Sequence, residues 1–242
     1  MKASLALSAF LSLAALAPSA CAYYTYGLGK SFSVGTAGSG PSIKKVSTTF
    51  NPGTPPTGQS GELILYPALS NGTGDFLMTS IESWQDQSFC GGTSSQWCIR
   101  TSVFSNRKST DGQLVALDPN TPVTITFERA SDESGWTQTA VVNDNIVSQL
   151  TFPSGPMTIF GLTTECDDYC TMTVSPQTYT NTTIELDSPE TDWQETMVIG
   201  STIYGDDTIN TQSQKPTVVN GVSSDSDGSV WSFESISIPQ LD

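Results

Sequence analysis

Short runs of β-branched and aromatic residues recur along most of the chain, separated by Gly, Pro, Asn and Asp. The sequence shows no helical periodicity longer than a turn or two, which favours strands over helices. In one run Val123, Ile125 and Phe127 alternate with polar residues, the pattern of a half-buried strand. The run 230–238 changes phase midway, which indicates a bulged terminal strand. The remaining ranges predicted as strands are 43–50, 61–67, 75–84, 97–104, 136–143, 146–152, 157–164, 177–187 and 197–204.

About ten or more strands at this spacing predict an all-β fold, a single-domain antiparallel β-sandwich or jelly roll. The Pro- and Gly-rich stretch 51–58 is typical of a stiff loop between strands rather than of a domain linker. Residues 205–229 are predicted as a long surface loop. We therefore expect one sandwich domain over residues 23–242.

Composition excludes several kinds of chemistry. The 242 residues carry 9 basic against 24 acidic side chains, and this net charge of −15 argues against partners such as nucleic acids or anionic membranes. The chain has no histidine, which excludes Ser-His-Asp and Cys-His hydrolases, histidine-ligated zinc sites and a histidine general base. We expect neither a metal nor a cofactor.

The amino end has the pattern of a signal peptide. Lys2 precedes an apolar run over 3–17, and small residues follow up to position 22. The run is shorter than the roughly 18–20 residues of a membrane span, and no later segment is long and apolar enough to be one. Residues 1–22 are therefore predicted to be cleaved in the secretory pathway, which makes the protein a secreted one.

Four cysteines remain after this leader, because Cys21 lies within it. Four cysteines permit three pairings. Proximity in the sequence favours the disulfides Cys90–Cys98 and Cys166–Cys170 in an oxidising compartment. The alternative, a zinc site with four thiolates, is disfavoured because neither pair has CxxC spacing.

Two N-glycosylation sequons are present, at Asn71 and Asn181. Each asparagine is expected on the surface, outside any closed pocket.

Carboxylates suggest a glycosidase, which needs one protonated and one ionised carboxyl about 5–10 Å apart. The glutamates in predicted strands are Glu82, Glu128, Glu185 and Glu234. In so acidic a chain, scattered carboxylates are also typical of a solvated face. The Asp-rich stretches 165–168 and 225–228 offer oxygen ligands for calcium, although turn chemistry explains them as well.

A glutamate–glutamine peptidase would also function without histidine, with the glutamine orienting the attacking water. Three glutamines lie next to tryptophans in the sequence: Gln85, Gln96 and Gln194. No longer motif supports this hypothesis.

Most aromatic side chains of a sandwich belong to its core. Strand alternation places Cys98 and Arg100 on one face of a strand and Trp97 and Ile99 on the other. An arginine within a strand needs a partner, either a carboxylate or a ligand oxygen.

Six blocks of the sequence follow one another in a distinctive order: 71–75, 80–84, 96–100, 164–170, 177–183 and 230–233. Together they resemble a group of small secreted fungal glycoproteins that includes the hetero-Diels–Alderases of tropolonic sesquiterpene pathways. The resemblance extends from Tyr24 to the carboxyl end, and its motifs are structural rather than catalytic.

This resemblance implies the coupling of a tropolone-derived o-quinone methide to a humulene-type sesquiterpene. Such a cycloaddition needs no nucleophile, only an apolar cavity that orients both partners and a donor to the quinone-methide oxygen. As catalytic residues we predict Trp97 and Arg100, and as substrate-binding residues Trp84 and Tyr169.

The expected ligands are small hydrophobic molecules, a polyketide and a terpene. Two alternatives remain open: a secreted, non-catalytic glycan- or ligand-binding β-sandwich, and a glutamate-dependent carbohydrate-active enzyme. The sequence leaves the oligomeric state undetermined.

Overall fold

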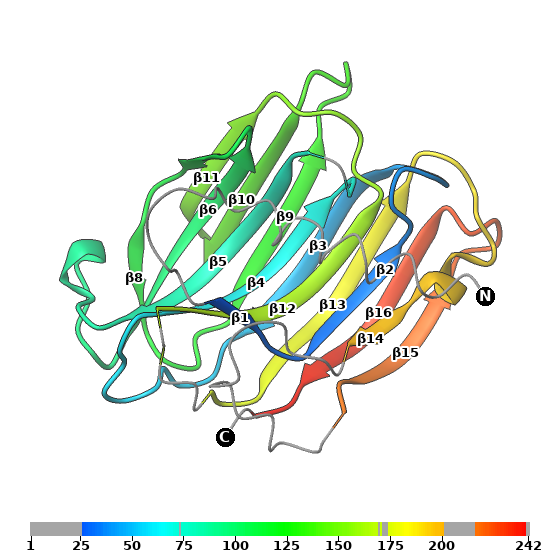
Figure 1. Cartoon of the computed structure of the whole chain (residues 1–242). Coiled ribbons are helices and arrows are strands. Elements are labelled where there is room, and N and C mark those ends of the chain that lie inside the picture. Colours follow the sequence, from blue (N-terminus) through cyan, green and yellow to red (C-terminus); the bar gives the residue numbers. More distant parts are fainter. Residues whose placement is uncertain (1–25, 73, 169, 171–173, 201–215, 241–242) are drawn as a thin grey trace.

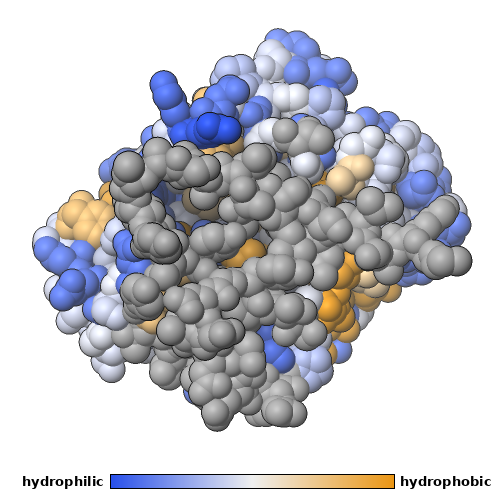
Figure 2. Space-filling model, in the orientation of Figure 1, coloured by the Kyte–Doolittle hydropathy of each residue, from blue (hydrophilic) through white to orange (hydrophobic). Residues whose placement is uncertain are grey.

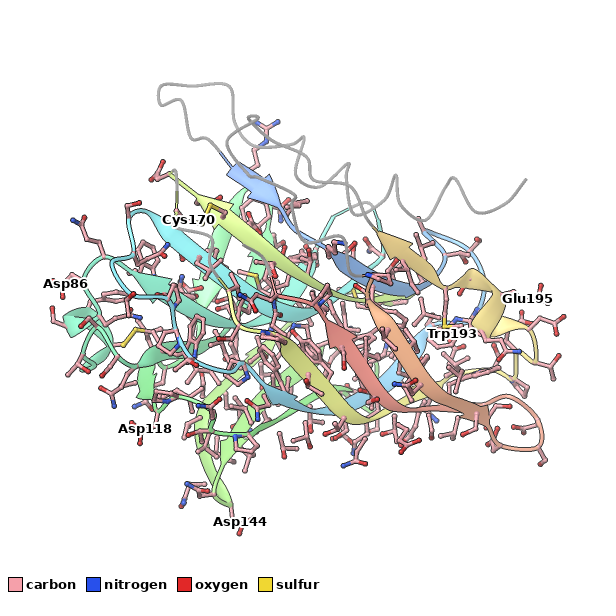
Figure 3. All side chains as sticks on the ribbon, turned by 90° about the horizontal axis from the view of Figure 1, so that it is seen from below. Asp86, Asp118, Asp144, Cys170, Trp193 and Glu195 are labelled. Carbon is pink, nitrogen blue, oxygen red and sulfur yellow. A yellow bond between two sulfur atoms is a disulfide. The ribbon has the colours of Figure 1, made fainter. Side chains whose placement is uncertain are left out.

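The computed structural model describes residues 26–72, 74–168, 170, 174–200 and 216–240. Within these ranges, two antiparallel sheets lie face to face as a β-sandwich (Figures 1 and 3), which confirms the predicted fold class. No helix in these ranges is long and apolar enough to cross a membrane. The predicted signal peptide, residues 1–22, and Tyr169 lie outside the described residues.

One sheet has nine strands. Its main order is β14-β2-β12-β4-β5-β6-β7, with β1 paired to β12 and β8 paired to β6. The strands are β1 (Tyr26–Leu28), β2 (Ser31–Gly35), β4 (Glu62–Ser70), β5 (Phe76–Trp84), β6 (Trp97–Ser105), β7 (Lys108–Asp111), β8 (Val115–Leu117), β12 (Ile159–Asp167) and β14 (Val198–Gly200).

The other sheet has seven strands in the order β11-β10-β9-β3-β13-β16-β15. Two short 3-10 helices, η1 (Ser88–Cys90) and η2 (Trp193–Thr196), complete the described elements. The seven strands are β3 (Ile43–Asn51), β9 (Val123–Arg129), β10 (Trp136–Val142), β11 (Asn145–Phe152), β13 (Gln177–Leu186), β15 (Val218–Ser224) and β16 (Val230–Ile238).

One expected loop is a strand. Residues 218–224 form β15 at the edge of the seven-stranded sheet, so the prediction of a surface loop over 205–229 is wrong there. None of the side chains of β15 is buried, and Gly221 interrupts the strand at a positive φ. An edge strand of this kind lacks the apolar alternation from which a strand is recognised.

The main core fills the space between the sheets (Figure 3) and combines aliphatic with large aromatic side chains. Phe50 of β3 stacks on Tyr179 of β13, with ring centroids 4.2 Å apart. Trp136 and Trp231 are almost completely buried in the same layer. In β13 the alternation of buried residues reverses at Asn181, whose φ of 51° turns the strand.

Strand β4 is buried on both faces, unlike a strand with one solvated face. Leu63, Leu65 and Leu69 point into the main core. The alternate residues belong to the outer face of the nine-stranded sheet, the face turned away from the other sheet. That face carries the site.

Candidate active site on the outer face of the nine-stranded sheet

A second apolar cluster lies on this outer face, separate from the main core. Ile64, Tyr66 and Ala68 of β4 form its buried part, and Phe76 and Met78 of β5 pack against them. The ring of Tyr66 meets that of Phe76 edge to face at 5.7 Å. Figure 2 views the molecule from this side, and several hydrophobic patches are visible on it.

Carboxyl groups line one end of this apolar cluster. The strand register places Asp167 of β12 opposite Glu62 of β4, and Glu62 opposite Trp84 of β5. One step along the face, Glu165 lies opposite Ile64. Side chains directly opposite each other on paired strands are about 4.5–5.5 Å apart at Cβ, so these carboxyls are neighbours.

Burial favours the protonated form of these groups. It raises the pKa of Glu62 to about 9, and the negative charges of Glu82 and Asp167 add to the effect. It raises the pKa of Asp167 to about 7, with Glu165 and Asp168 contributing. It also raises the pKa of Glu165, although the hydroxyl of Tyr66 donates a hydrogen bond of 2.8 Å to that carboxyl.

Glu62 and Asp167 each keep a buried oxygen, Oε1 and Oδ1 respectively, without a hydrogen-bond partner in the described residues. A buried polar atom without a partner destabilises the fold, commonly by about 1–3 kcal/mol. A protonated carboxyl in this setting is a neutral hydrogen-bond donor available to a ligand.

An ion pair lies beside these acids. The guanidinium of Arg100 donates from Nε to Glu82 at 2.8 Å and from Nη1 to Asp111 at 3.3 Å. The Arg100 side chain is 23% exposed, whereas Glu82 is completely buried. Glu82 is therefore a structural carboxylate of this face, and Arg100 retains an accessible edge.

A pocket of about 280 Å³ opens next to Glu62. One wall is aromatic, because Trp84 meets Phe89 edge to face at 5.3 Å and Phe89 is half exposed. The backbone N–H of Ser88 donates a hydrogen bond to Asp86 and lowers the pKa of that carboxyl. Asp86 lies at one end of the sandwich (Figure 3). The residues that line the pocket are Gly61, Glu62, Trp84, Gln85, Asp86, Phe89 and Asp168.

The structure divides the predicted site residues between two layers. Arg100 and Trp84 lie on the outer face, and Trp84 is the only one of the five tryptophans that is not almost fully buried. Trp97 is completely buried in the main core, where its indole N–H donates to the carbonyl of Gly53 at 3.1 Å. Strand alternation points Trp97 to the opposite face of β6 from Arg100. In this position Trp97 has no contact with a ligand bound on the outer face, so its predicted catalytic role is not supported.

We expect Trp97→Phe to change stability and leave ligand binding unchanged. The smaller ring leaves a void and removes the indole hydrogen bond to the Gly53 carbonyl, which keeps the hydrogen bond from the backbone N–H of Asn120. The two losses together cost about 2 kcal/mol. For a chain of this size that lowers Tm by roughly 4–8 °C. Thermal unfolding followed by circular dichroism measures the shift, and a variant with native Tm but lost binding would contradict this assignment.

Both predicted disulfides are present, Cys90–Cys98 and Cys166–Cys170. This rules out the four-thiolate zinc site. No cluster of metal-binding side chains is found among the described residues. The stretch 225–228 forms the turn between β15 and β16, in which Asp225 accepts hydrogen bonds from Ser229 and Val230.

One sequon asparagine lies on the seven-stranded sheet, and the other lies in the loop that follows a strand of the nine-stranded sheet. Asn181 is exposed on β13, and Asn71 is half-buried directly after β4. Glycosylation of both remains a prediction.

Sequence reasoning proposed four strand glutamates, of which only Glu82 lies on the nine-stranded sheet. The other three are on strands of the seven-stranded sheet: Glu128, Glu185 and Glu234. Of the three glutamines beside tryptophans, Gln85 shares the pocket with Glu62. Gln96 instead donates to Asp118 at 2.7 Å, and Gln194 lies on η2.

Glu62 and Tyr66 were not among the site residues predicted from the sequence, and Glu165 and Asp167 were placed only in a candidate calcium-binding stretch. One signal was available, because range 61–67 is apolar at every position except Gly61 and Glu62. Such a continuous apolar run indicates a strand buried on both faces. A carboxyl at its start is then a candidate for a buried acid.

No family model matches the chain, and no curated protein matches it. Among solved structures, it is similar to a scytalido-glutamic peptidase in complex with a transition-state analogue inhibitor. The TM-score is 0.54 at 13% identity, over 87% of this chain and 98% of that one. A second similar structure is SCP-B of the eqolisin peptidase family, with a TM-score of 0.48 at 11% identity over 88% of this chain and 98% of that one. At these identities, the first likeness shows that the sandwich fold is shared and nothing further.

Proposed function

We propose that the outer face of the nine-stranded sheet is the active site of a cofactor-independent enzyme. Its reaction is the coupling of an oxygen-bearing conjugated ring to the alkene of an apolar partner, a hetero-Diels–Alder reaction of the kind used in tropolonic sesquiterpene pathways. The observation that carries the proposal is the apolar cluster around Tyr66 bordered by acids whose pKa burial raises, that of Glu62 to about 9.

The two halves of this face fit two partners of different polarity. The partly buried Phe76 and Met78 offer the hydrocarbon surface of this cluster, where an apolar molecule loses contact with water. The acid end supplies neutral donors from Glu62 and a cationic donor from Arg100. Holding both partners side by side removes much of the entropic cost of a bimolecular reaction.

The developing charge of the reaction favours these donors. As the new carbon–oxygen and carbon–carbon bonds form, electron density rises on the ring oxygen of the quinone methide. A hydrogen bond placed at that oxygen is worth about 100-fold to 1000-fold in rate at an enzyme site. Glu62 needs only to donate, and it transfers no proton.

Two substitutions at Glu62 test this role. Glu62→Leu removes the donor and should slow coupling by about 100-fold, whereas Glu62→Gln keeps an N–H donor and should stay within about tenfold of the wild type. The assay mixes purified protein with humulenol and a tropolone quinone-methide precursor, and chiral chromatography reads the product against a control without protein. Glu185→Gln, on the other sheet, is the matched control and should be unchanged. If the wild type gives the product mixture of the protein-free control, the proposed coupling is excluded.

A second candidate function is glutamate-dependent hydrolysis. A specific observation favours it: Glu62, with a raised pKa, shares its pocket with Asp86, whose pKa is lowered, and with Gln85. One protonated and one ionised carboxyl are what an acid–base mechanism needs. A glutamine beside them is able to orient a water molecule. The sandwich fold shared with a glutamic peptidase is compatible with such a reaction.

The same variants separate the two candidates. Hydrolysis needs proton transfer, which an amide does not perform, so Glu62→Gln and Glu62→Leu would then lose activity equally. Denatured protein at acidic pH and a panel of polysaccharides are suitable substrates. Cleavage by the wild type that disappears in both variants would favour the hydrolase over the coupling enzyme.

A further inference from the structure

Glu82 is a completely buried carboxylate on the outer face, and it has donors on both oxygens. Its Oε1 accepts from the hydroxyl of Ser80 at 2.5 Å and from Nε of Arg100 at 2.8 Å. Its Oε2 accepts from the indole N–H of Trp84 at 3.0 Å. A carboxylate with these partners is not free to act as a base or nucleophile.

The same contacts fix the two side chains that flank it. Trp84 and Arg100 come from neighbouring strands, and one carboxylate holds the ring nitrogen of the first and the guanidinium of the second. Asp111 binds Nη1 of Arg100 at 3.3 Å and is itself held by the hydroxyl of Ser109 at 2.6 Å. The Arg100 side chain remains 23% exposed, so part of the guanidinium is accessible to a ligand.

The backbone next to Trp84 is held as well. Gln87 is buried, and its side-chain oxygen accepts from the backbone N–H of Trp84 at 3.4 Å. Its side-chain nitrogen donates to the carbonyl of Gln96 at 2.9 Å, beside the strand that carries Arg100. The disulfide Cys90–Cys98 closes the same loop onto β6.

We propose that Glu82 is a positioning residue that holds Trp84 and Arg100 as a clamp for a flat conjugated ring bearing oxygen atoms. This inference rests on the proposed function, because it names the half of that site which takes the oxygenated partner. A buried carboxylate that organises one aromatic wall and one planar cation acts through them and does not touch the reacting atoms.

The chemistry of the two walls defines the ligand. An indole face or edge binds a flat ring through stacking or edge-to-face contact. A guanidinium presents coplanar N–H donors that match neighbouring oxygens on such a ring. The oxygens of the ligand therefore carry partial or full negative charge, and the protonated Glu62 nearby does not repel them.

Tropolone itself is the probe, since it is a flat seven-membered ring with adjacent oxygens. Binding is followed by tryptophan fluorescence. Quenching by iodide reports on Trp84, because the other four tryptophans are almost fully buried. We expect Glu82→Gln to raise the Kd for tropolone by about tenfold or more and to increase quenching of Trp84 by iodide. Glu185→Gln, an exposed position on the other sheet, is the matched control and should change neither quantity.

Two further variants keep the proposal testable if Glu82→Gln does not fold. Trp84→Phe keeps the wall but loses its hydrogen bond to Glu82, and Arg100→Lys loses the coplanar donors. Each should weaken tropolone binding several-fold. An unchanged Kd for tropolone and unchanged iodide quenching in Glu82→Gln would overturn the proposal. If Glu82→Gln does not fold, an unchanged Kd in both Trp84→Phe and Arg100→Lys would overturn it. A wild-type protein that does not bind tropolone would overturn it as well.

The outcome for the clamp is separable from that for the proposed function. A wild type that binds tropolone, loses binding in Glu82→Gln and yet gives no coupling product would support the clamp and exclude the coupling reaction. A wild type that couples its substrates with unchanged stereochemistry and rate in Glu82→Gln would support the coupling and overturn the clamp.

Discussion

The protein should be more stable at pH 5 than at pH 8, with a Tm higher by roughly 6–12 °C. In the unfolded chain Glu62 loses its proton near its ordinary pKa of 4.5, whereas the folded protein keeps the proton up to a pKa of about 9. Between these values the folded state binds more protons, so stability falls as pH rises. Asp167 acts in the same direction between 3.8 and about 7. Allowing for partial solvent access, the loss is on the order of 3 kcal/mol.

Glu62→Gln isolates this contribution. The amide is a neutral replacement for the protonated acid, so the variant should have a Tm close to that of the wild type at pH 5 and a higher Tm than the wild type at pH 8. Thermal unfolding at pH 5, 6.5 and 8 measures both curves, and Glu185→Gln again serves as the control. The pH range from 5 to 8 is straightforward to interpret because the chain has no histidine that would titrate within it. A wild-type Tm that stays level or rises from pH 5 to pH 8 would show that Glu62 is ionised in the folded protein.

Local patterns predicted the strands, because in a strand with one buried face every second side chain is apolar and buried. The alternation of Val123, Ile125 and Phe127 places all three in the core, as expected. The pairing of each cysteine with its nearest neighbour was also correct, since the strand and loop ends that carry them lie close in sequence as well as in space.

The candidate site was much less accessible to sequence reasoning, because it depends on which strands are neighbours. Glu62, Glu82 and Glu165 meet only because β12, β4 and β5 are adjacent, although β4 begins at Glu62 and its partner β12 only at Ile159. The raised pKa values follow from that adjacency and from burial on both faces of β4. Trp97 was chosen for its neighbours in the sequence, but alternation directs it away from them and into the core.

Gly61→Ala should be the most damaging single-methyl change near the site. Gly61 has a φ of +64°, and a Cβ added there would lie 2.3 Å from the carbonyl oxygen of Asp167 and 2.4 Å from that of Asp168. These are backbone atoms, so β12 and the start of β4 must move apart for the methyl group to fit. We expect a loss of about 3 kcal/mol or more, combining backbone strain with overpacking.

Gly58→Ala is the matched control, because Gly58 lies in the same loop at a φ of +69° with no atom within 4 Å of the added methyl. That variant bears only the cost of the left-handed conformation, about 1 kcal/mol. Thermal unfolding of both variants, together with tropolone binding, separates the cost of the left-handed backbone conformation from the cost of steric overlap. The separation also tests the site itself, since Gly61 precedes Glu62 and contacts the residue opposite it. If Gly61→Ala were no worse than Gly58→Ala in both measurements, β4 and β12 would not approach closely here, and the pairing of Glu62 with Asp167 would have to be abandoned.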